Sequence, residues 1–481
     1  MINKRFFSAS ACAVHLAIKI GCSPFASAET TTSYQTSAGG VIVENISDSA
    51  DEPGAAGAAD AEEAAGTVTA DAKNIGVSAK AASVTESDST SDSTSDSTSD
   101  SIEDSGSALE TSKLFTDRDL EQKADLSGAR MISVADSKVY TIKNAGIYVI
   151  SGTASNAQIC VEAGEEDKVQ LVLDGVKITN TSTPCIYVRK ADKVFVTTTD
   201  SDNALSVTGT FKADGETNTD AVIFSRDDLV LNGTGTLTVS STDNGISSKD
   251  DLKITGGTLD ITCVSDALEA NDSVVMADGN VTVRSDKDGI HAENDEDDLK
   301  GYVYIGGGTV NITAADDAIH ATTIAQIDSG TVTLSCAEGL EGTWIQINGG
   351  KISIDASDDG INAGKKSSFR TPLIEINGGE LTITMGAGDT DAIDSNGDLL
   401  ITGGTIDLTA QSPFDYDGNA QKTGGKIIVN GTETDSITNQ MMGGPGGWHG
   451  GFNRGDFNRG DFHRGDFNRD DFNNNGDYNY E

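Results

Sequence analysis

Acidic side chains recur in a five-residue pattern along the second half of this 481-residue sequence. Each copy reads acid, small residue, aliphatic residue, polar residue, small residue, as in Asp266-Ala-Leu-Glu269-Ala. Carboxylate oxygens are hard ligands of the kind that bind Ca²⁺ in proteins. The pattern therefore predicts a metal site, whose candidate ligands are Asp266, Glu269, Asp286, Asp288, Asp316, Asp317, Glu338, Glu341, Asp358, Asp359, Asp391 and Asp394.

Stacking of these copies would bring like charges together. Equivalent positions on neighbouring parallel strands lie ~4.8 Å apart. Two ionised carboxylates at that spacing repel by about 1 kcal/mol in water, and by several kcal/mol at an effective dielectric constant near 20. Carboxylates only accept hydrogen bonds, so either their pKa values rise or cations lie between them. The oxygen-rich ligand set makes Ca²⁺ the predicted cofactor, and a solvated acidic face is the alternative.

Two histidines take the polar position in neighbouring copies of the pattern, His291 and His320. We expect them to be polar turn residues that pair with nearby acids. A pH-sensitive role or a role in binding a transition metal is the alternative, because imidazole titrates near neutral pH and ligates such metals.

A longer repeat contains the acidic pattern. A glycine between two runs of alternating aliphatic residues returns about every 22 residues. A unit this short must stack on its neighbours to bury its apolar face. A β-propeller blade needs about 40 residues, so one turn of a parallel β-helix fits better, with Leu259 and Ile261 stacked inside over Val281 and Val283. The central glycines are Gly235, Gly257, Gly279, Gly308, Gly330, Gly350, Gly379, Gly404 and Gly425.

Composition divides the chain into four parts. Residues 1–28 read as a secretory signal peptide that ends in an Ala-Ser-Ala cleavage site, which predicts a secreted protein. Residues 29–112 have too little apolar matter for a core and read as an acidic low-complexity linker. Residues 113–435 hold the repeats. Residues 436–481 are Gly-rich and then repeat Phe-Asn-Arg-Gly-Asp, so they are expected to be disordered.

The net charge limits the partners. Lys and Arg number 33 against 76 Asp and Glu, which gives a formal net charge of −43. Such a field repels nucleic acid and anionic membranes and attracts cations. After the signal peptide, no segment has the ~20 apolar residues that a membrane-spanning helix needs. Cys160, Cys185, Cys263 and Cys336 lie in or beside strand-like runs and are expected to be buried free thiols.

The repeat region also resembles a known family. It contains Ile-Lys-Asn-Ala-Gly-Ile-Tyr-Val-Ile-Ser-Gly at 142–152 and related motifs at 167–175, 221–229 and 250–257. Together these resemble bacterial extracellular carbohydrate-binding proteins of plant-fibre-degrading clostridia, across 113–435. The resemblance implies a single-stranded right-handed, pectate-lyase-like β-helix that contains calcium. It also implies binding to cellulose-like and acidic, pectin-like polysaccharides, with no established lyase activity.

Three functions compete. The first is a calcium-dependent polysaccharide-binding protein that is not an enzyme and associates with the cell wall or cell surface. The second is a calcium-dependent pectate lyase, which needs a Lys or Arg as base. The third is an adhesin or spacer, since the tail contains Arg-Gly-Asp three times. The candidate carbohydrate-binding residues are Trp344, Lys365, Lys366 and Arg370.

Overall fold

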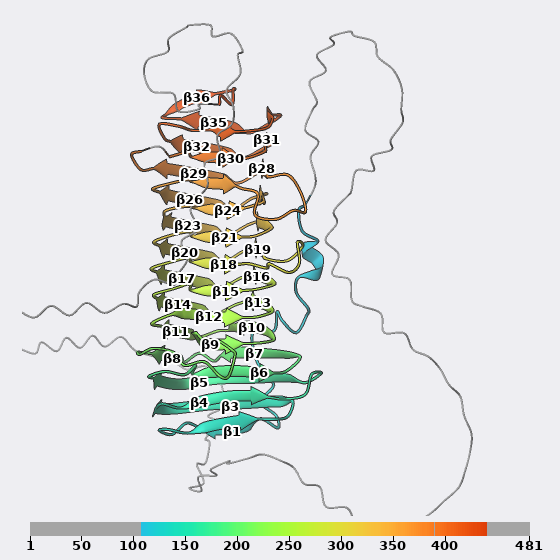
Figure 1. The fold of residues 1–481 in the computed structure, drawn as a ribbon. Helices are drawn as coiled ribbons and strands as arrows, with labels where there is room; N and C mark the ends of the chain where they lie inside the picture. The colour runs from blue at the N-terminus through green and yellow to red at the C-terminus, as the bar shows by residue number, and fades with distance from the viewer. Residues whose placement is uncertain (1–106, 389, 440–481) are drawn as a thin grey trace, which may run out of the picture. The chain divides into compact units, whose positions relative to one another are not determined.

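The computed structural model describes residues 107–388 and 390–439, which form a stack of coils with up to three strands each (Figure 1). Strands of one coil pair in parallel with strands of the coils before and after it. This confirms the predicted all-β parallel β-helix. The predicted signal peptide, the predicted linker up to residue 106 and the predicted tail from residue 440 lie outside the described residues.

Each coil has three faces. The first and second faces belong to one 24-stranded sheet, because the long strands β3 and β5 run through both, and the third face is a 12-stranded sheet. The first face consists of β1 (Arg130–Ser133), β3 (Gly146–Ser155), β5 (Lys168–Asn180), β7 (Lys193–Thr198), β10 (Asp228–Gly233), β13 (Asp251–Ile254), β16 (Ser273–Met276), β19 (Tyr302–Ile305), β22 (Ile324–Ile327), β25 (Trp344–Ile347), β28 (Leu373–Ile376), β31 (Asp398–Ile401) and β34 (Ala420–Lys422).

The other two faces complete the coils. After the ends of β3 and β5, the second face continues through β8 (Asp202–Val207), β11 (Thr236–Ser240), β14 (Thr258–Cys263), β17 (Asn280–Ser285), β20 (Thr309–Ala314), β23 (Thr331–Cys336), β26 (Lys351–Ala356), β29 (Glu380–Met385), β32 (Thr405–Thr409), β35 (Lys426–Val429) and the antiparallel β36 (Thr432–Thr434). The third face consists of β2 (Val139–Ile142), β4 (Gln158–Glu162), β6 (Ile186–Lys190), β9 (Ala221–Ser225), β12 (Asn244–Ser248), β15 (Leu268–Ala270), β18 (Ile290–Ala292), β21 (Ile319–Ala321), β24 (Leu340–Gly342), β27 (Ile361–Ala363), β30 (Ile393–Ser395) and β33 (Asp415–Tyr416).

The apolar core runs through the inside of the coils. Leu259 pairs with Val281, and Ile261 pairs with Val283, in the predicted register. All four side chains are buried, whereas the intervening residues of β14 and β17 face outward. Stacked aliphatic side chains on adjacent coils thus fill the interior, which is how a repeat too short to fold alone gains a core.

Glycines turn the chain between the first and second faces. Gly257 has φ +81° and Gly330 has φ +103°, in the left-handed region that glycine adopts without steric cost. The predicted central glycines hold this conformation in every coil but one. In the coil of β10 and β11 the left-handed residue is Gly233, with φ +117°, rather than Gly235.

A strap formed by residues 107–122 crosses the outside of the first face (Figure 1, cyan). The Ala108 and Leu109 amides donate hydrogen bonds of 2.9 Å to the side-chain oxygens of Gln346 and Gln326. These two strap residues are only 4% exposed, although composition placed them in the linker. The ordered packing therefore begins earlier than residue 113.

The C-terminal half of the strap continues over earlier coils. Lys253 donates to the Leu114 carbonyl at 2.8 Å, and the fully buried Asp119 forms an ion pair with Lys193 at 3.3 Å. The strap therefore runs opposite to the order of the coils and covers their outward side chains. Within the described residues, helical structure is limited to the 3-10 turn η1 (Thr111–Lys113), and no helix is long and apolar enough to cross a membrane.

The four cysteines of the β-helix are free thiols, as predicted. Cys160, Cys185 and Cys263 are buried and Cys336 is half-buried. Burial raises the pKa of Cys185 to about 12, so this thiol stays neutral at physiological pH.

Candidate cation and glycan site

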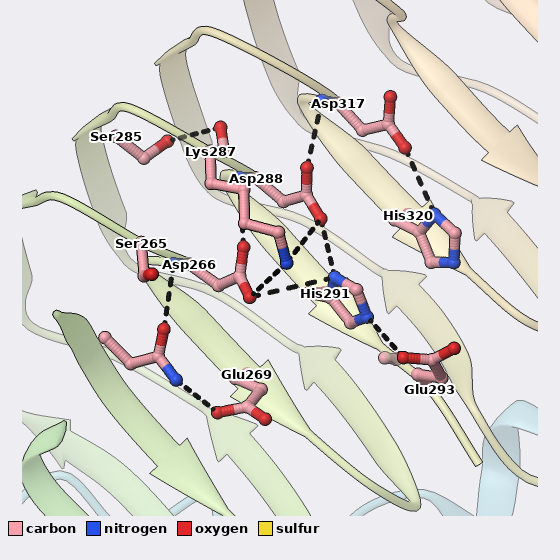
Figure 2. A network of polar contacts seen from close by, with 12 residues as sticks. Ser265, Asp266, Glu269, Ser285, Lys287, Asp288, His291, Glu293, Asp317 and His320 are labelled. Atoms are coloured by element: carbon pink, nitrogen blue, oxygen red, sulfur yellow. Dashed lines mark hydrogen bonds and ion pairs between the residues drawn. The ribbon is translucent and has the colours of Figure 1, made fainter. Parts of the chain in front are cut away.

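The third face brings the predicted acids into two columns. Strand register aligns Leu268 with Ile290, and the acids two residues earlier, Asp266 and Asp288, are therefore equivalent (Figure 2). We call these equivalent positions the first column, and those one residue after the aliphatic position the second column. The first column is Asp266, Asp288, Asp317, Glu338, Asp359 and Asp391, and the second is Glu269, His291, His320, Glu341, Asn362 and Asp394.

Backbone N–H groups donate hydrogen bonds to several carboxylates of the first column. The Asp288 amide donates to Asp266 Oδ1 at 3.1 Å, and the Asp317 amide donates to Asp288 Oδ1 at 3.1 Å. The Asp391 amide donates to Asp359 Oδ1 at 3.0 Å. Asp266, Asp288 and Asp359 thus each accept a hydrogen bond from the next coil, an arrangement that fixes the register of these acids and favours their ionised form.

A lysine neutralises the lower end of the first column. Lys287 Nζ lies 3.0 Å from Asp266 Oδ2 and 4.0 Å from Asp288 Oδ2 (Figure 2). Burial alone would lower the pKa of Lys287, but the two carboxylates outweigh it and raise that pKa. In these coils the chain itself therefore supplies a cation between the acids.

The two histidines neutralise the middle of the columns. His291 Nδ1 lies 2.6 Å from Asp288 Oδ2, and His320 Nδ1 lies 3.1 Å from Asp317 Oδ2 and 2.5 Å from Glu341 Oε2. Burial would lower the pKa of His320, but Asp317 and Glu341 raise it to about 10. Burial would raise the pKa of Glu341, but His320 and Lys366 lower it to about 2.

Three acids in the upper part of the columns differ from those below. Among the described residues, no Lys, Arg or His forms an ion pair with Glu338, Asp359 or Asp394. Burial, and then neighbouring acids, raises the pKa of Glu338 to about 7, of Asp359 to about 6 and of Asp394 to about 7. Asp415 adds a further carboxylate beside Asp394 on the next strand. An all-oxygen donor set of this kind fits Ca²⁺.

The remaining predicted ligands lie at the margin of the columns. Asp286, Asp316 and Asp358 are exposed. Oxygens of Asp316 come within 4.8 Å of those of Asp288 and Asp317, so these three could share an ion. Glu269 is engaged by Lys249 at 3.1 Å and by the Asn244 amide at 2.8 Å.

The predicted carbohydrate-binding residues do not form one surface. Trp344 lies beside the strap, only 7% exposed, with its indole N–H donating to Glu375 at 3.0 Å. The Arg370 guanidinium stacks on the Trp344 ring at 3.9 Å, so this ring offers no open platform for a sugar. Lys366 pairs with Glu341 of the second column, and Lys365 is exposed.

A second group of acids escaped the sequence analysis. Asp250 and Asp272 approach each other at the corner between the third and first faces, and burial and the hydrogen bond that protonated Asp250 donates to Asp272 raise the pKa of Asp250 to about 8. Lys300 lies 2.6 Å from Asp272 and offsets part of the charge. Neither acid belongs to the five-residue pattern, so the repeat gave no signal for this pair.

Comparisons with known proteins place the chain in a family. A family model described as carbohydrate-binding domain-containing protein matches residues 136–392 and 335–441, which together are more than half of the chain. The chain therefore belongs to the carbohydrate-binding domain-containing protein family. A relative of that description from Acetivibrio thermocellus is 39% identical over 150 residues, which is 30% of this chain and 51% of the relative. The match thus spans about half the length of that relative.

A solved structure also shows similarity. It is described as a polysaccharide lyase-like protein from C. thermocellum, in a gadolinium derivative. The sequences are 34% identical, the match covers 47% of this chain and 93% of that one, and the TM-score is 0.41.

Proposed function

We propose that this protein is a secreted, calcium-dependent polysaccharide-binding protein that takes acidic, pectin-like glycans of plant cell walls. The observation that carries the proposal is the upper part of the acidic columns. Glu338, Asp359 and Asp394 are half-buried, each has neighbouring acids that raise its pKa, and none has an ion-paired cation among the described residues. Membership of a carbohydrate-binding family supports a polysaccharide as the partner.

Calcium would supply the positive charge that an acidic glycan needs. A protein with a net charge of −43 repels a polyuronate unless cations lie between the two. Asp359, Asp391 and Asp394 are the residues that would hold Ca²⁺, together with Glu338. Bound there, the ion would neutralise these carboxylates and leave positions for the carboxylates of the glycan.

Acidic rather than neutral glycans are favoured by the position of the aromatic residues. Neutral sugars stack on exposed aromatic rings. Tyr302, Tyr304 and Trp344 are each at most 8% exposed, and all three belong to the cluster that the strap covers. The described β-helix thus offers these sugars few open aromatic platforms.

The lyase alternative gains no support from the basic residues. A lyase base must be able to lose its proton near the working pH. Burial would lower the pKa of Lys366, but its pairing with Glu341 raises that pKa, which keeps the amine protonated. Arg370 lies over the ring of Trp344, which belongs to the cluster that the strap covers.

Affinity electrophoresis in polygalacturonate tests the proposal. We expect retardation in Ca²⁺ that disappears in EGTA, and little retardation in a neutral β-glucan in either condition. A variant with Asp359→Asn and Asp394→Asn should lose the retardation, while Asp260→Asn, at an outward position of β14, should keep it. Retardation that survives both EGTA and the double variant would refute the proposed site. Ultraviolet absorbance from unsaturated products would reveal lyase activity.

A further inference from the structure

One imidazole and two carboxylates converge on the third face, where β21 pairs with β24. His320 and Glu341 are register partners on these two strands. His320 Nδ1 lies 2.5 Å from Glu341 Oε2 and 3.1 Å from Asp317 Oδ2. One ligand atom from each of these three residues, which we call the His320 group, lies within 4.8 Å of the other two. A single metal ion between them is therefore within reach of all three side chains.

Neighbouring side chains hold the His320 group in place. The His320 ring stacks on His291, with ring centroids 4.6 Å apart, and Asp317 approaches the ring from three residues earlier (Figure 2). Lys366 pairs with Glu341 Oε1, so the other oxygen of this carboxylate is the one beside the ring. The side chains of His320, Asp317 and Glu341 are 13%, 11% and 7% exposed, in that order. Ligands held by packing in this way need little reordering to bind an ion.

A second group of the same kind differs in one respect. Asp266, Asp288 and His291 also bring one ligand atom each within 4.8 Å of the others. There, however, Lys287 Nζ lies 3.0 Å from Asp266 Oδ2 and 4.0 Å from Asp288 Oδ2. An ammonium group thus already lies between the two carboxylates and takes the place that a metal ion would need.

The His320 group has a carboxylate in place of that lysine. Asp316 is the register equivalent of the lysine, and its oxygens come within 4.8 Å of those of Asp317. The three carboxylates of Asp316, Asp317 and Glu341 therefore face two cations, Lys366 and protonated His320. Exchange of the ring proton for a divalent ion adds one positive charge, which balances the three carboxylates.

We propose that Asp317, His320 and Glu341 bind one divalent transition-metal ion, with Zn²⁺ as the probe. Imidazole nitrogen and carboxylate oxygen are both zinc ligands, and imidazole favours Zn²⁺, Cu²⁺ or Ni²⁺ over Ca²⁺. The ion takes the place of the proton on His320 Nδ1, which is released to solvent. The proposal does not rest on the glycan function, whose calcium ligands are other acids of the columns.

Calorimetric titration of the full-length protein with Zn²⁺ tests the proposal. At pH 8, where protons compete less for the imidazole, with Ca²⁺ in excess to fill carboxylate-only sites, one Zn²⁺ should bind per chain. His320→Asn should weaken binding by about tenfold or more, because the loss of even an outer-shell partner costs that much. Asparagine is a matched replacement, since Asn362 occupies the same column. Glu341→Gln should weaken binding to a similar degree.

Two further variants keep the result decisive. His291→Asn removes an imidazole from the same column but no ligand, so it should bind Zn²⁺ almost as the wild type does. Asp316→Asn changes an exposed side chain, so it should fold normally but bind Zn²⁺ several-fold more weakly through the loss of one negative charge. Absence of Zn²⁺ binding in the wild type would overturn the proposal. So would undiminished binding in His320→Asn, which would assign the ion to other groups such as His449 or His463.

Discussion

Lys287 lies 3.0 Å from the Asp266 carboxylate of the preceding coil and links the first two acids of the column that begins there. The chain thus provides its own cation where the repeat pattern alone predicted a bound ion. The same role falls to His291, His320 and Lys366 in the next coils. Among the described residues, Glu338, Asp359 and Asp394 have no such partner, and this difference from the lower acids is the basis of the proposed calcium site.

Lys287→Gln should destabilise the protein by about 1 kcal/mol. Asp266 is almost buried, but the Lys287 side chain is 48% exposed, so solvent screens the pair and the loss stays small. Urea unfolding with and without Ca²⁺ measures the change, and Ca²⁺ should restore part of the stability of the variant. Lys351→Gln serves as the control, because both partners of its pair with Glu380 are at least 70% exposed. Equal effects of the two substitutions would contradict the role of Lys287.

The stability of the protein in EGTA should be greatest at about pH 4–5. Glu338, Asp359 and Asp394 have raised pKa values in the folded state, about 7, 6 and 7, so the folded state binds more protons and stability falls as pH rises from about 4 to 7. The pKa of Glu341 is lowered to about 2 in the folded state, so at low pH the unfolded state binds more protons. Stability therefore also falls as pH drops below about 4.5.

Melting temperatures between pH 3 and pH 8 check this profile. Ca²⁺ should flatten the decline above pH 5, because it binds the ionised carboxylates. The variant with Asp359→Asn and Asp394→Asn should show a shallower decline in EGTA. A melting temperature that climbs steadily from pH 4 to pH 8 in EGTA would contradict the predicted charge balance.

Leu109→Ala should destabilise the protein by about 2 kcal/mol, because it opens a cavity where the strap packs on the first face. Leu126→Ala is the matched control, since Leu126 is 51% exposed and should change the free energy of unfolding by no more than about 0.5 kcal/mol. Limited proteolysis should also cut the Leu109 variant faster within residues 107–122. Equal stability of the two variants would show that the strap contributes little.

Trp344→Phe should lower stability by about 1–3 kcal/mol and leave glycan affinity unchanged. The substitution keeps the aromatic packing under Arg370 but removes the indole N–H that donates to the buried Glu375. Chemical denaturation and affinity electrophoresis measure the two effects separately. A large loss of glycan affinity in a folded variant would show instead that Trp344 takes part in glycan binding.

The sequence predicted the features that the repeat determines, which are the coil and the alignment of residues between coils. Periodic glycines and alternating aliphatic residues fix the coil, so the stacking of Leu259 on Val281 and the alignment of Asp266 with Asp288 are confirmed. These features follow from the local spacing of residues, because a strand alternates its faces and a coil repeats at a constant length.

Contacts between distant segments could not be predicted in this way. The strap amide of Ala108 meets Gln346 across 238 residues, and no repeat connects the two. The strap covers Trp344, a predicted carbohydrate-binding residue, together with Tyr302 and Tyr304. The pairing of Lys287 with Asp266 was missed for another reason, because Lys287 replaces the acid that other copies place just before the first column.

Calcium titration monitored by thermal melting tests the central claim most directly. Wild-type protein freed of metal with EGTA should gain melting temperature as Ca²⁺ is added, and elemental analysis should find calcium in the untreated protein. The variant with Asp359→Asn and Asp394→Asn should show little gain, because it lacks two of the carboxylates that have no basic partner within residues 107–388 and 390–439. An unchanged melting temperature in the wild type, with no calcium in the protein, would contradict the account.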